Sequence, residues 1–284
     1  MQFGSIHLDI VPGGRFRLDG GNLFGVVPKP LWERRFPADT FNRVAVVANC
    51  LLVRSAGFTA LIQAGLGEKW TSRERELHAI EPGPTLEDGL AVRGITREQI
   101  DALVVTTLRF DHAGGATSVG EDGVVPSFPE ATLYVQKSEL ARARSLQTRE
   151  GGPYRAEDWR PYAETGGLEA VEGEAEIRPG LTLVPLPGHA AGSQAVRIES
   201  EGRIAFVFGD ALPTSAHVPI VWMMAAELYP VELIASKKRL LDRAAAEGWL
   251  CVFERDPNVP WGTLVDELDG RRRVHVVATD REEF

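Results

Sequence analysis

The sequence has few cysteines, no long run of apolar residues and no excess of basic charge. Only two of its 284 residues are cysteine, Cys50 and Cys251, and each lies in an apolar stretch. Two thiols cannot build a disulfide framework or a four-thiolate zinc site, so both are predicted to be core residues in a reducing compartment. No segment reaches the roughly 18 uninterrupted apolar residues that a membrane helix requires. Asn49 interrupts the best candidate, residues 44–53.

The charge balance argues against a second group of functions. The chain has 31 basic and 40 acidic side chains, a formal net charge of −9, and no basic stripe interleaved with aromatic residues. Nucleic acid is therefore not an expected partner. Residues 1–14 carry no basic segment followed by an apolar one, so they do not resemble a signal peptide. We expect a cytoplasmic protein that acts on a small molecule and not at a membrane.

Short runs rich in Val, Ile, Leu and Phe recur along the chain and are predicted to be strands. They span residues 3–11, 43–53, 59–63, 102–106, 132–135, 182–185, 195–198, 204–208, 250–253 and 274–278. Helical spacing of apolar residues marks residues 73–78, 96–102, 137–145, 156–164 and 231–247. This alternation favours an α/β fold with sheets packed face to face and helices outside, in a single domain over residues 1–284.

Two long segments are too apolar for ordinary surface loops. Residues 13–37 are rich in Gly and Pro and contain Phe24, and residues 210–230 contain His217 and Trp222. Loops of this length and apolarity are uncommon unless they line a site or an interface. Loops that simply pack on the core are the alternative.

Acidic and histidine side chains follow three of the predicted strands. The pair Asp111-His112 follows one strand and precedes Gly-Gly, His189 lies in a Pro-Gly-His turn, and Asp210 ends another strand. Glycines at such turns allow the backbone to approach a bound group closely. Each motif alone is common, but the three in this order are much more specific. They predict one site assembled from the ends of strands.

This order of motifs resembles the metallo-β-lactamase-fold hydrolases, in the branch of N-acyl homoserine lactonases and methyl parathion hydrolase. The resemblance includes Asp-Gly-Gly at 19–21, Asn49, Gly-Leu-Gly at 65–67 and Arg-Asp-Pro at 255–257, nearly the whole chain. It implies a four-layer αβ/βα sandwich with metals at the edge between two sheets. It also implies a His-x-His-x-Asp-His motif, a His in a Pro-Gly-His turn, a bridging Asp and a final His before Asp-Pro.

The ligand pattern that the resemblance implies is only partly present. Thr107 and Arg109 stand at the first two histidine positions, and Arg255 stands at the last. Gln63 stands where the family has a supporting Asp. Four ligand positions are retained, namely Asp111, His112, His189 and Asp210. Because zinc usually takes at least three protein ligands, we expect either no metal or one weakly bound divalent ion, zinc or manganese.

The arginines at ligand positions suggest how the acids are compensated. Arginine cannot ligate a metal, and it carries a permanent charge with five donors. Two carboxylates a few ångströms apart repel by roughly 4 kcal/mol at an effective dielectric constant of 20. Arg109 and Arg255 stand where a compensating charge is needed. We interpret their guanidinium groups as replacements for the metals, paired with Asp111 and Asp210.

Two functions remain open. The first is hydrolysis of an ester, lactone or phosphotriester by the four retained residues, either around one metal ion or with a histidine base and arginines that stabilise an oxyanion. The second is an inactive member that binds a small anionic or acyl ligand. The predicted substrate-binding residues are Arg109, Arg255, His217, Trp222 and Phe24. The resemblance also allows a homodimer, in which the apolar N-terminal loop covers a neighbouring subunit's pocket.

Overall fold

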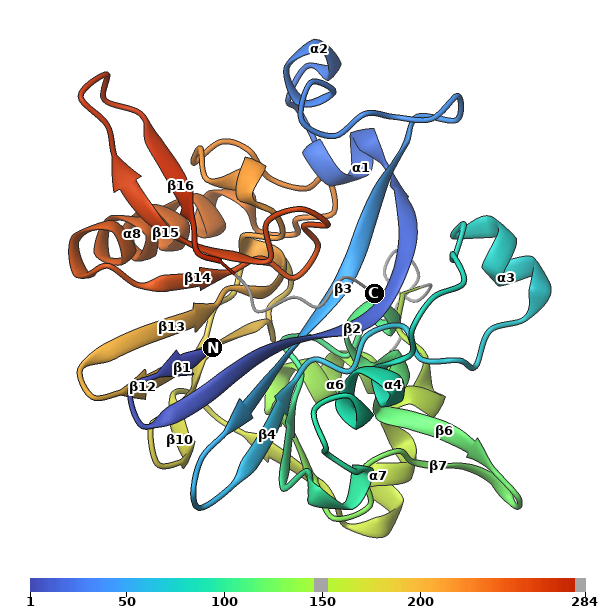
Figure 1. Ribbon diagram of the computed structural model, residues 1–284. Helices are drawn as coiled ribbons and strands as arrows, with labels where there is room; N and C mark the ends of the chain where they lie inside the picture. Colours follow the sequence, from blue (N-terminus) through green and yellow to red (C-terminus); the bar gives the residue numbers. More distant parts are fainter. Residues whose placement is uncertain (146–152, 279–284) are drawn as a thin grey trace.

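Two seven-stranded sheets form the centre of the molecule (Figure 1) in the computed structural model, which describes residues 1–145 and 153–278. The first sheet contains, in spatial order, β1 (Gln2–Phe3), β2 (Ile6–Asp19), β3 (Arg43–Arg54), β4 (Thr59–Ile62), β5 (Ala102–Val104), β8 (Thr132–Gln136) and β9 (Leu168–Val171). The second contains β10 (Ala175–Arg178), β11 (Leu181–Pro185), β12 (Gln194–Ser200), β13 (Arg203–Val207), β14 (Leu250–Val252), β15 (Trp261–Asp266) and β16 (Arg272–Val276). A separate hairpin pairs β6 (Thr117–Gly120) with β7 (Gly123–Pro126).

The helices lie outside the two sheets. They are α1 (Gly20–Phe24), α2 (Lys29–Trp32), α3 (Ser72–Leu77), α4 (Leu86–Ala91), α5 (Phe110–Ala113), α6 (Lys137–Ser145), α7 (Arg160–Thr165) and α8 (Pro230–Glu247). Figure 1 shows α8 beside β14 and β15 of the second sheet. In the described part of the chain, none of the helices has both the length and the apolarity needed to cross a membrane.

Alternate side chains along the strands pack between the two sheets or between a sheet and its helices, so the molecule has four layers. In β4, Ile62 belongs to the cluster between the sheets that contains Leu183 of β11, whereas its neighbour Leu61 packs in the cluster that contains Leu140 of α6. Successive side chains of a strand point to opposite faces, so each sheet has an apolar face toward its partner and another toward helices. Leu240 of α8 belongs to the cluster on the second sheet's outer face. The predicted αβ/βα sandwich is therefore confirmed.

Strand direction brings several strand ends to one edge of each sheet. β4, β5 and β8 run parallel in the first sheet, and β13 runs parallel to β14 in the second. β11 has the same direction as β13 because both pair antiparallel with β12. The segments that follow β4, β5, β11, β13 and β14 therefore leave their sheets at carboxyl ends, where ligand sites of such folds are commonly built.

Residues 13–37, predicted as a loop, contain regular structure instead. β2 continues to Asp19, whose side chain caps α1 by accepting from the backbone N–H of Asn22 at 2.9 Å. The strand continues past Gly13 and Gly14 because they form a bulge that shifts its register against β3 without ending the pairing. The second predicted loop contains short 3-10 turns, η4 (Gly209–Ala211) and η5 (Ser215–His217).

Candidate functional site

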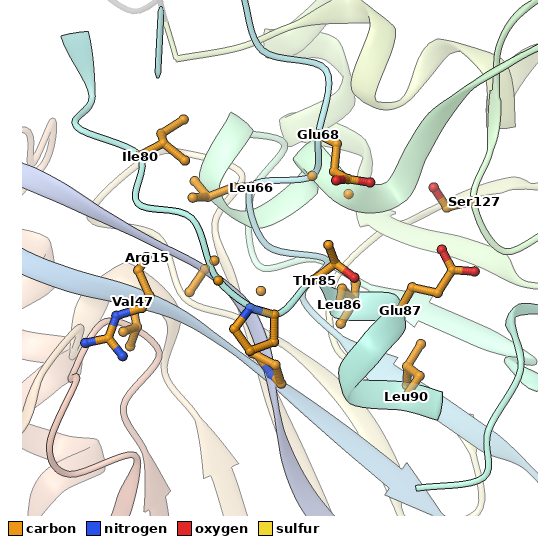
Figure 2. A pocket seen from close by; sticks show the side chains of 18 of the residues that line it. Arg15, Val47, Leu66, Glu68, Ile80, Thr85, Leu86, Glu87, Leu90 and Ser127 are labelled. Carbon is orange, nitrogen blue, oxygen red and sulfur yellow. The ribbon is translucent and has the colours of Figure 1, made fainter. Parts of the chain in front are cut away.

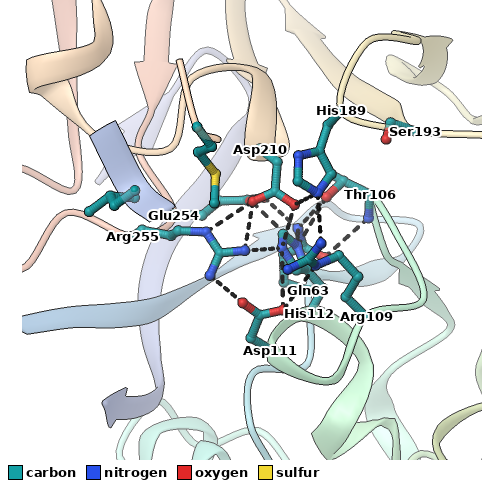
Figure 3. Close-up of polar contacts among 12 residues, drawn as sticks. Gln63, Thr106, Arg109, Asp111, His112, His189, Ser193, Asp210, Glu254 and Arg255 are labelled. Atoms are coloured by element: carbon teal, nitrogen blue, oxygen red, sulfur yellow. Dashed lines mark hydrogen bonds and ion pairs between the residues drawn. The ribbon is translucent and has the colours of Figure 1, made fainter. Parts of the chain in front are cut away.

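Four predicted site residues converge where the ends of the two sheets meet (Figure 3). Asp111 and His112 lie in α5, shortly after β5 of the first sheet. His189 lies in the turn between β11 and β12, and Asp210 lies in η4 after β13. None of the four exposes more than 5% of its surface. The fold therefore gathers two acids and two histidines from both sheets into one buried cluster.

Arg255, which follows β14, inserts its guanidinium group between the acids. Its Nε and Nη2 donate to Oδ1 of Asp210 at 2.9 and 2.6 Å, and its Nη1 donates to Oδ2 of Asp111. Nη2 also lies 2.7 Å from Nε2 of His112. Because only 3% of Arg255 is exposed, these contacts form a buried ion-pair network that connects the two sheets.

The opposite charges of this network stabilise one another. Burial is the largest single influence on both acids and raises their pKa, but Arg255 and the neighbouring histidine and arginine side chains together outweigh it. Together these charges, of which Arg255 is the strongest, hold the pKa of Asp111 at about 2 and the pKa of Asp210 well below the ordinary 3.8. Burial lowers the pKa of Arg255, but the two acids raise it above its usual value. At neutral pH the centre therefore contains two carboxylates and a guanidinium cation.

His189 is contacted by charged groups on both sides of its ring. Nη1 of Arg109 lies 3.0 Å from Nε2 of His189, and Oδ2 of Asp210 lies 3.2 Å from the same nitrogen. Oε2 of Glu227 lies 3.1 Å from Nδ1. Arg109 was predicted to pair with an acid. Its guanidinium group lies closer to His189 than to Asp111, whose Oδ1 is 3.9 Å from Nε of Arg109. Sequence reasoning missed Glu227, although it is the one acid besides Asp210 in the apolar segment 210–230, which was an available signal.

A further polar group lies on the other side of His112. Nε2 of Gln63 lies 2.5 Å from Nδ1 of His112 and 2.6 Å from Oε1 of Glu254. Oγ1 of Thr106 is 3.1 Å from the same Nδ1. Burial raises the pKa of Glu254 to about 7. Gln63 thus joins His112 to a further buried carboxyl group besides Asp111 and Asp210, and sequence reasoning missed it because Glu254 has no motif of its own.

Three predicted binding residues form an aromatic cluster. Phe24 stacks on His217 with ring centroids 5.0 Å apart and meets the edge of Trp222 at 6.0 Å. Phe24 and His217 are fully buried. Both nitrogens of His217 are engaged, at 2.9 Å by the carbonyl oxygen of Leu23 and at 2.7 Å by Oγ1 of Thr214. Burial lowers the pKa of His217 to about 3. These side chains pack on one another, and their contact with a substrate stays a prediction.

Two facing sheets with an acid-histidine cluster at their shared edge define a metallo-β-lactamase-type sandwich. A family model described as the metallo-beta-lactamase superfamily matches residues 43–269, well over half of the chain. The chain belongs to this superfamily, as its motifs predicted.

Known proteins similar to this chain include named and probable hydrolases. It is 27% identical over 223 residues to a probable metallo-hydrolase of Mycobacterium tuberculosis, a match that covers 67% of this chain and 66%, just under two thirds, of the relative. It is 28% identical over 204 residues to an N-acyl homoserine lactonase of Bacillus thuringiensis, covering 68% of this chain and 70% of the lactonase. Among solved structures, a probable metal-dependent hydrolase from Staphylococcus aureus has a TM-score of 0.92 and 27% identity, with 100% of each chain covered.

The side chains of this centre do not fit the metal pair of the superfamily. Protein nitrogen and oxygen ligands hold zinc at about 2.0–2.2 Å, so an ion shared by Asp111, His112 and Asp210 would need the space that the guanidinium of Arg255 fills. At two other ligand positions, Thr107 offers a buried hydroxyl and Arg109 a cation. Across residues 1–145 and 153–278, no three Asp, Glu, His or Cys side chains are arranged to hold a metal.

Proposed function

We propose that this chain is a non-hydrolytic member of the metallo-β-lactamase superfamily that binds a small anionic or acyl ligand. The observation that supports the proposal is the position of Arg255, whose guanidinium group contacts Asp111 and Asp210 together. Such a cation neutralises the carboxylates, but it cannot ligate water and lower its pKa as a divalent metal does.

Burial of the cluster supports the same proposal. His112 exposes 2% of its surface, and both of its ring nitrogens already face polar neighbours, Gln63 and Arg255. A general base must lie within about 2.6–3.2 Å of the proton that it removes, or reach it through one water molecule. His112 is closed off from such a proton in this structure.

Metal-free hydrolysis is a second candidate, and the surroundings of His189 favour it. Glu227 contacts Nδ1 of His189 and orients the ring, while Arg109 lies beside Nε2. The side chain of Arg109 is 15% exposed, so it lies nearer to solvent than Arg255. In this candidate His189 acts as the general base and Arg109 stabilises an oxyanion.

Metal analysis and an activity panel test the proposal. Protein produced with excess zinc and manganese should contain well under one ion per chain and should not turn over a lactone, an aryl ester or a phosphotriester. A variant with Thr107→His, Arg109→His and Arg255→His should gain metal. The matched control, Thr107→Asn with Arg109→Gln and Arg255→Gln, should not, because it removes the arginines without adding ligands.

The outcomes separate the two candidates. Turnover by the metal-free parent that Arg109→Gln abolishes would replace the proposal with the second candidate. Stoichiometric metal together with turnover in the parent would contradict both. The first result needs only the parent and Arg109→Gln, and the second needs only the parent, so neither depends on whether the triple variants fold.

A further inference from the structure

A cavity of about 1120 Å³ opens on the first sheet, and none of the residues of the arginine-filled centre lines it (Figure 2). Its walls come from β2, β3, the segment after β4, the segment that includes α3 and α4, β6, and the residues that follow β7. Asn49 and Pro257 belong to its lining, and the backbone N–H of Asn49 donates to the carbonyl oxygen of Glu254 at 2.7 Å. The cavity is therefore a neighbour of the centre but not part of it.

Two glycines bring the main chain of β2 to the cavity wall. A Cβ at Gly13 would lie 2.6 Å from the carbonyl oxygen of Ala48, and a Cβ at Gly14 would lie 2.6 Å from Cδ1 of Leu66. Gly14 also has a φ of 118°, a conformation that side chains disfavour. The two glycines therefore let the β2 backbone pack closely against Ala48 and Leu66 at the wall, where any side chain would clash.

Basic side chains outnumber acidic ones along this wall, although the whole chain has a net charge of −9. The lining includes three glutamates and five basic residues, Arg15, Lys69, Arg75, Arg93 and Arg97. This local surplus of positive charge favours an anion.

Three of the five basic residues are engaged in the fold. Lys69 pairs with Asp158 at 3.1 Å, Arg93 donates to two main-chain carbonyl groups, and Arg97 pairs with Glu87. Arg15 and Arg75 have weaker contacts, the first with Glu81 at 3.6 Å and the second with a carbonyl oxygen at 3.4 Å. Arg15 has 58% of its side chain exposed. These two guanidinium groups are the most available cations of the wall.

Apolar side chains cover much of the remaining surface. Figure 2 shows Leu66, Ile80, Leu86 and Leu90 along the cavity, and Phe128 also lines it. A ligand that fits both parts has an anionic group and an aliphatic body. Because three glutamates share the wall, a single negative charge fits better than two.

We propose that this cavity is the ligand site and that it takes an aliphatic carboxylate, with the carboxylate at Arg15 and Arg75 and the chain along the leucine and isoleucine side chains. The proposal rests on the proposed function, since it assigns the ligand of a binding protein to a site outside the superfamily's metal edge. It places recognition on the β2 bulge and on the segment between β4 and β5.

Calorimetric titration with octanoate, octylammonium and octanol tests this assignment in the full chain. Octanoate should bind more tightly than either of the others. The variant Arg15→Gln with Arg75→Gln should raise the Kd for octanoate about tenfold or more, because it removes two charge-assisted donors. Arg73→Gln is the matched control, since Arg73 lies in α3 with Arg75, is exposed and does not line the cavity. Circular dichroism establishes that each variant is folded.

The other possible results of the titration and of the activity panel each decide one of the two proposals. An unchanged Kd in the double variant, or no octanoate binding by the parent, overturns the cavity assignment. If Arg109→Gln no longer binds octanoate while the double variant still does, the ligand binds at the superfamily's metal edge. This result overturns the cavity assignment but is consistent with the proposed function. Hydrolytic turnover by the parent overturns the proposed function and leaves the titration result to decide the cavity.

Discussion

Replacing Arg255 by methionine should convert a charge-compensated centre into one with two uncompensated acids. Methionine has a similar length and an apolar side chain, so the main loss is the guanidinium group that contacts Asp111 and Asp210. Removing one partner of a buried ion pair typically costs about 3–5 kcal/mol. For a chain of 284 residues the unfolding entropy is about 0.6 kcal/mol per kelvin, so Tm should fall by about 5–8 °C.

The pH dependence of this loss is more diagnostic than its size. In the parent, the pKa of Asp111 is about 2 and that of Asp210 is also below 3.8, so their stabilisation is present above pH 4 and is lost as the pH falls. In Arg255→Met, burial without the cation should raise both pKa values above 3.8, so stability should fall as the pH rises. The difference in Tm should therefore widen between pH 4 and pH 7 in scanning calorimetry.

Two controls separate this effect from general damage. Arg243→Met removes an exposed guanidinium that contacts Glu247 at 2.9 Å, and it should change Tm by about 1 °C or less. Adding Asp111→Asn and Asp210→Asn to Arg255→Met should recover part of the lost stability. If Arg255→Met melts like the parent at both pH values, then Arg255 is not the counter-ion of these acids.

Three other predictions address groups around the centre. Glu254→Gln should raise Tm at pH 8 more than at pH 4, because the pKa of Glu254 is raised from 4.5 to about 7 and its carboxyl group loses stability as the pH rises through that interval; equal shifts in calorimetry would contradict this. His217→Gln should reduce the loss of stability between pH 6.5 and pH 4, because the pKa of His217 is lowered to about 3 in the folded chain and acid therefore favours the unfolded chain. If urea titrations give the variant the same dependence of unfolding free energy on pH as the parent, this prediction is wrong. Gly209→Ala should lower the unfolding free energy by about 1–3 kcal/mol, because Gly209 has a φ of 61° and the new Cβ would lie 2.8 Å from Oγ1 of Thr106. In the same urea assay Gly202→Ala should cost less, since Gly202 has a φ of 75° and no atom within 4 Å of its Cβ position.

Most of the apolar strands were predictable, although β15 was missed, whereas the short polar strands were not. The predicted runs 43–53 and 250–253 correspond to β3 and β14, whose residues are mostly buried. β7 and β10 have exposed and partly exposed residues in four-residue strands, so they lack a clear hydrophobic pattern. The predicted helix 96–102 is wrong beyond η1 (Arg97–Gln99), because Ile100 is fully buried and the chain enters β5 at Ala102.

The motif positions of the site were predictable, but its outer contacts were not. The Asp-His motif, the Pro-Gly-His turn and the final Arg-Asp-Pro each follow a strand, and strand order brings them together. Gln63 and Glu254 are 191 positions apart and meet only through the packing of the two sheets. The pairing of Arg109 with His189 depends on which way each side chain points, and residue types alone do not fix that direction.

The cation at the centre is a covalent part of the polypeptide. A bound metal stabilises a protein by mass action, so its contribution falls when the free ion becomes scarce. The guanidinium of Arg255 is present once in every chain from synthesis onward and cannot dissociate into the medium. It follows β14 of the second sheet and contacts Asp111, which follows β5 of the first. The side chain of Arg255 thus links the two sheets at this edge, and this link does not depend on the concentration of metal ions in the solution.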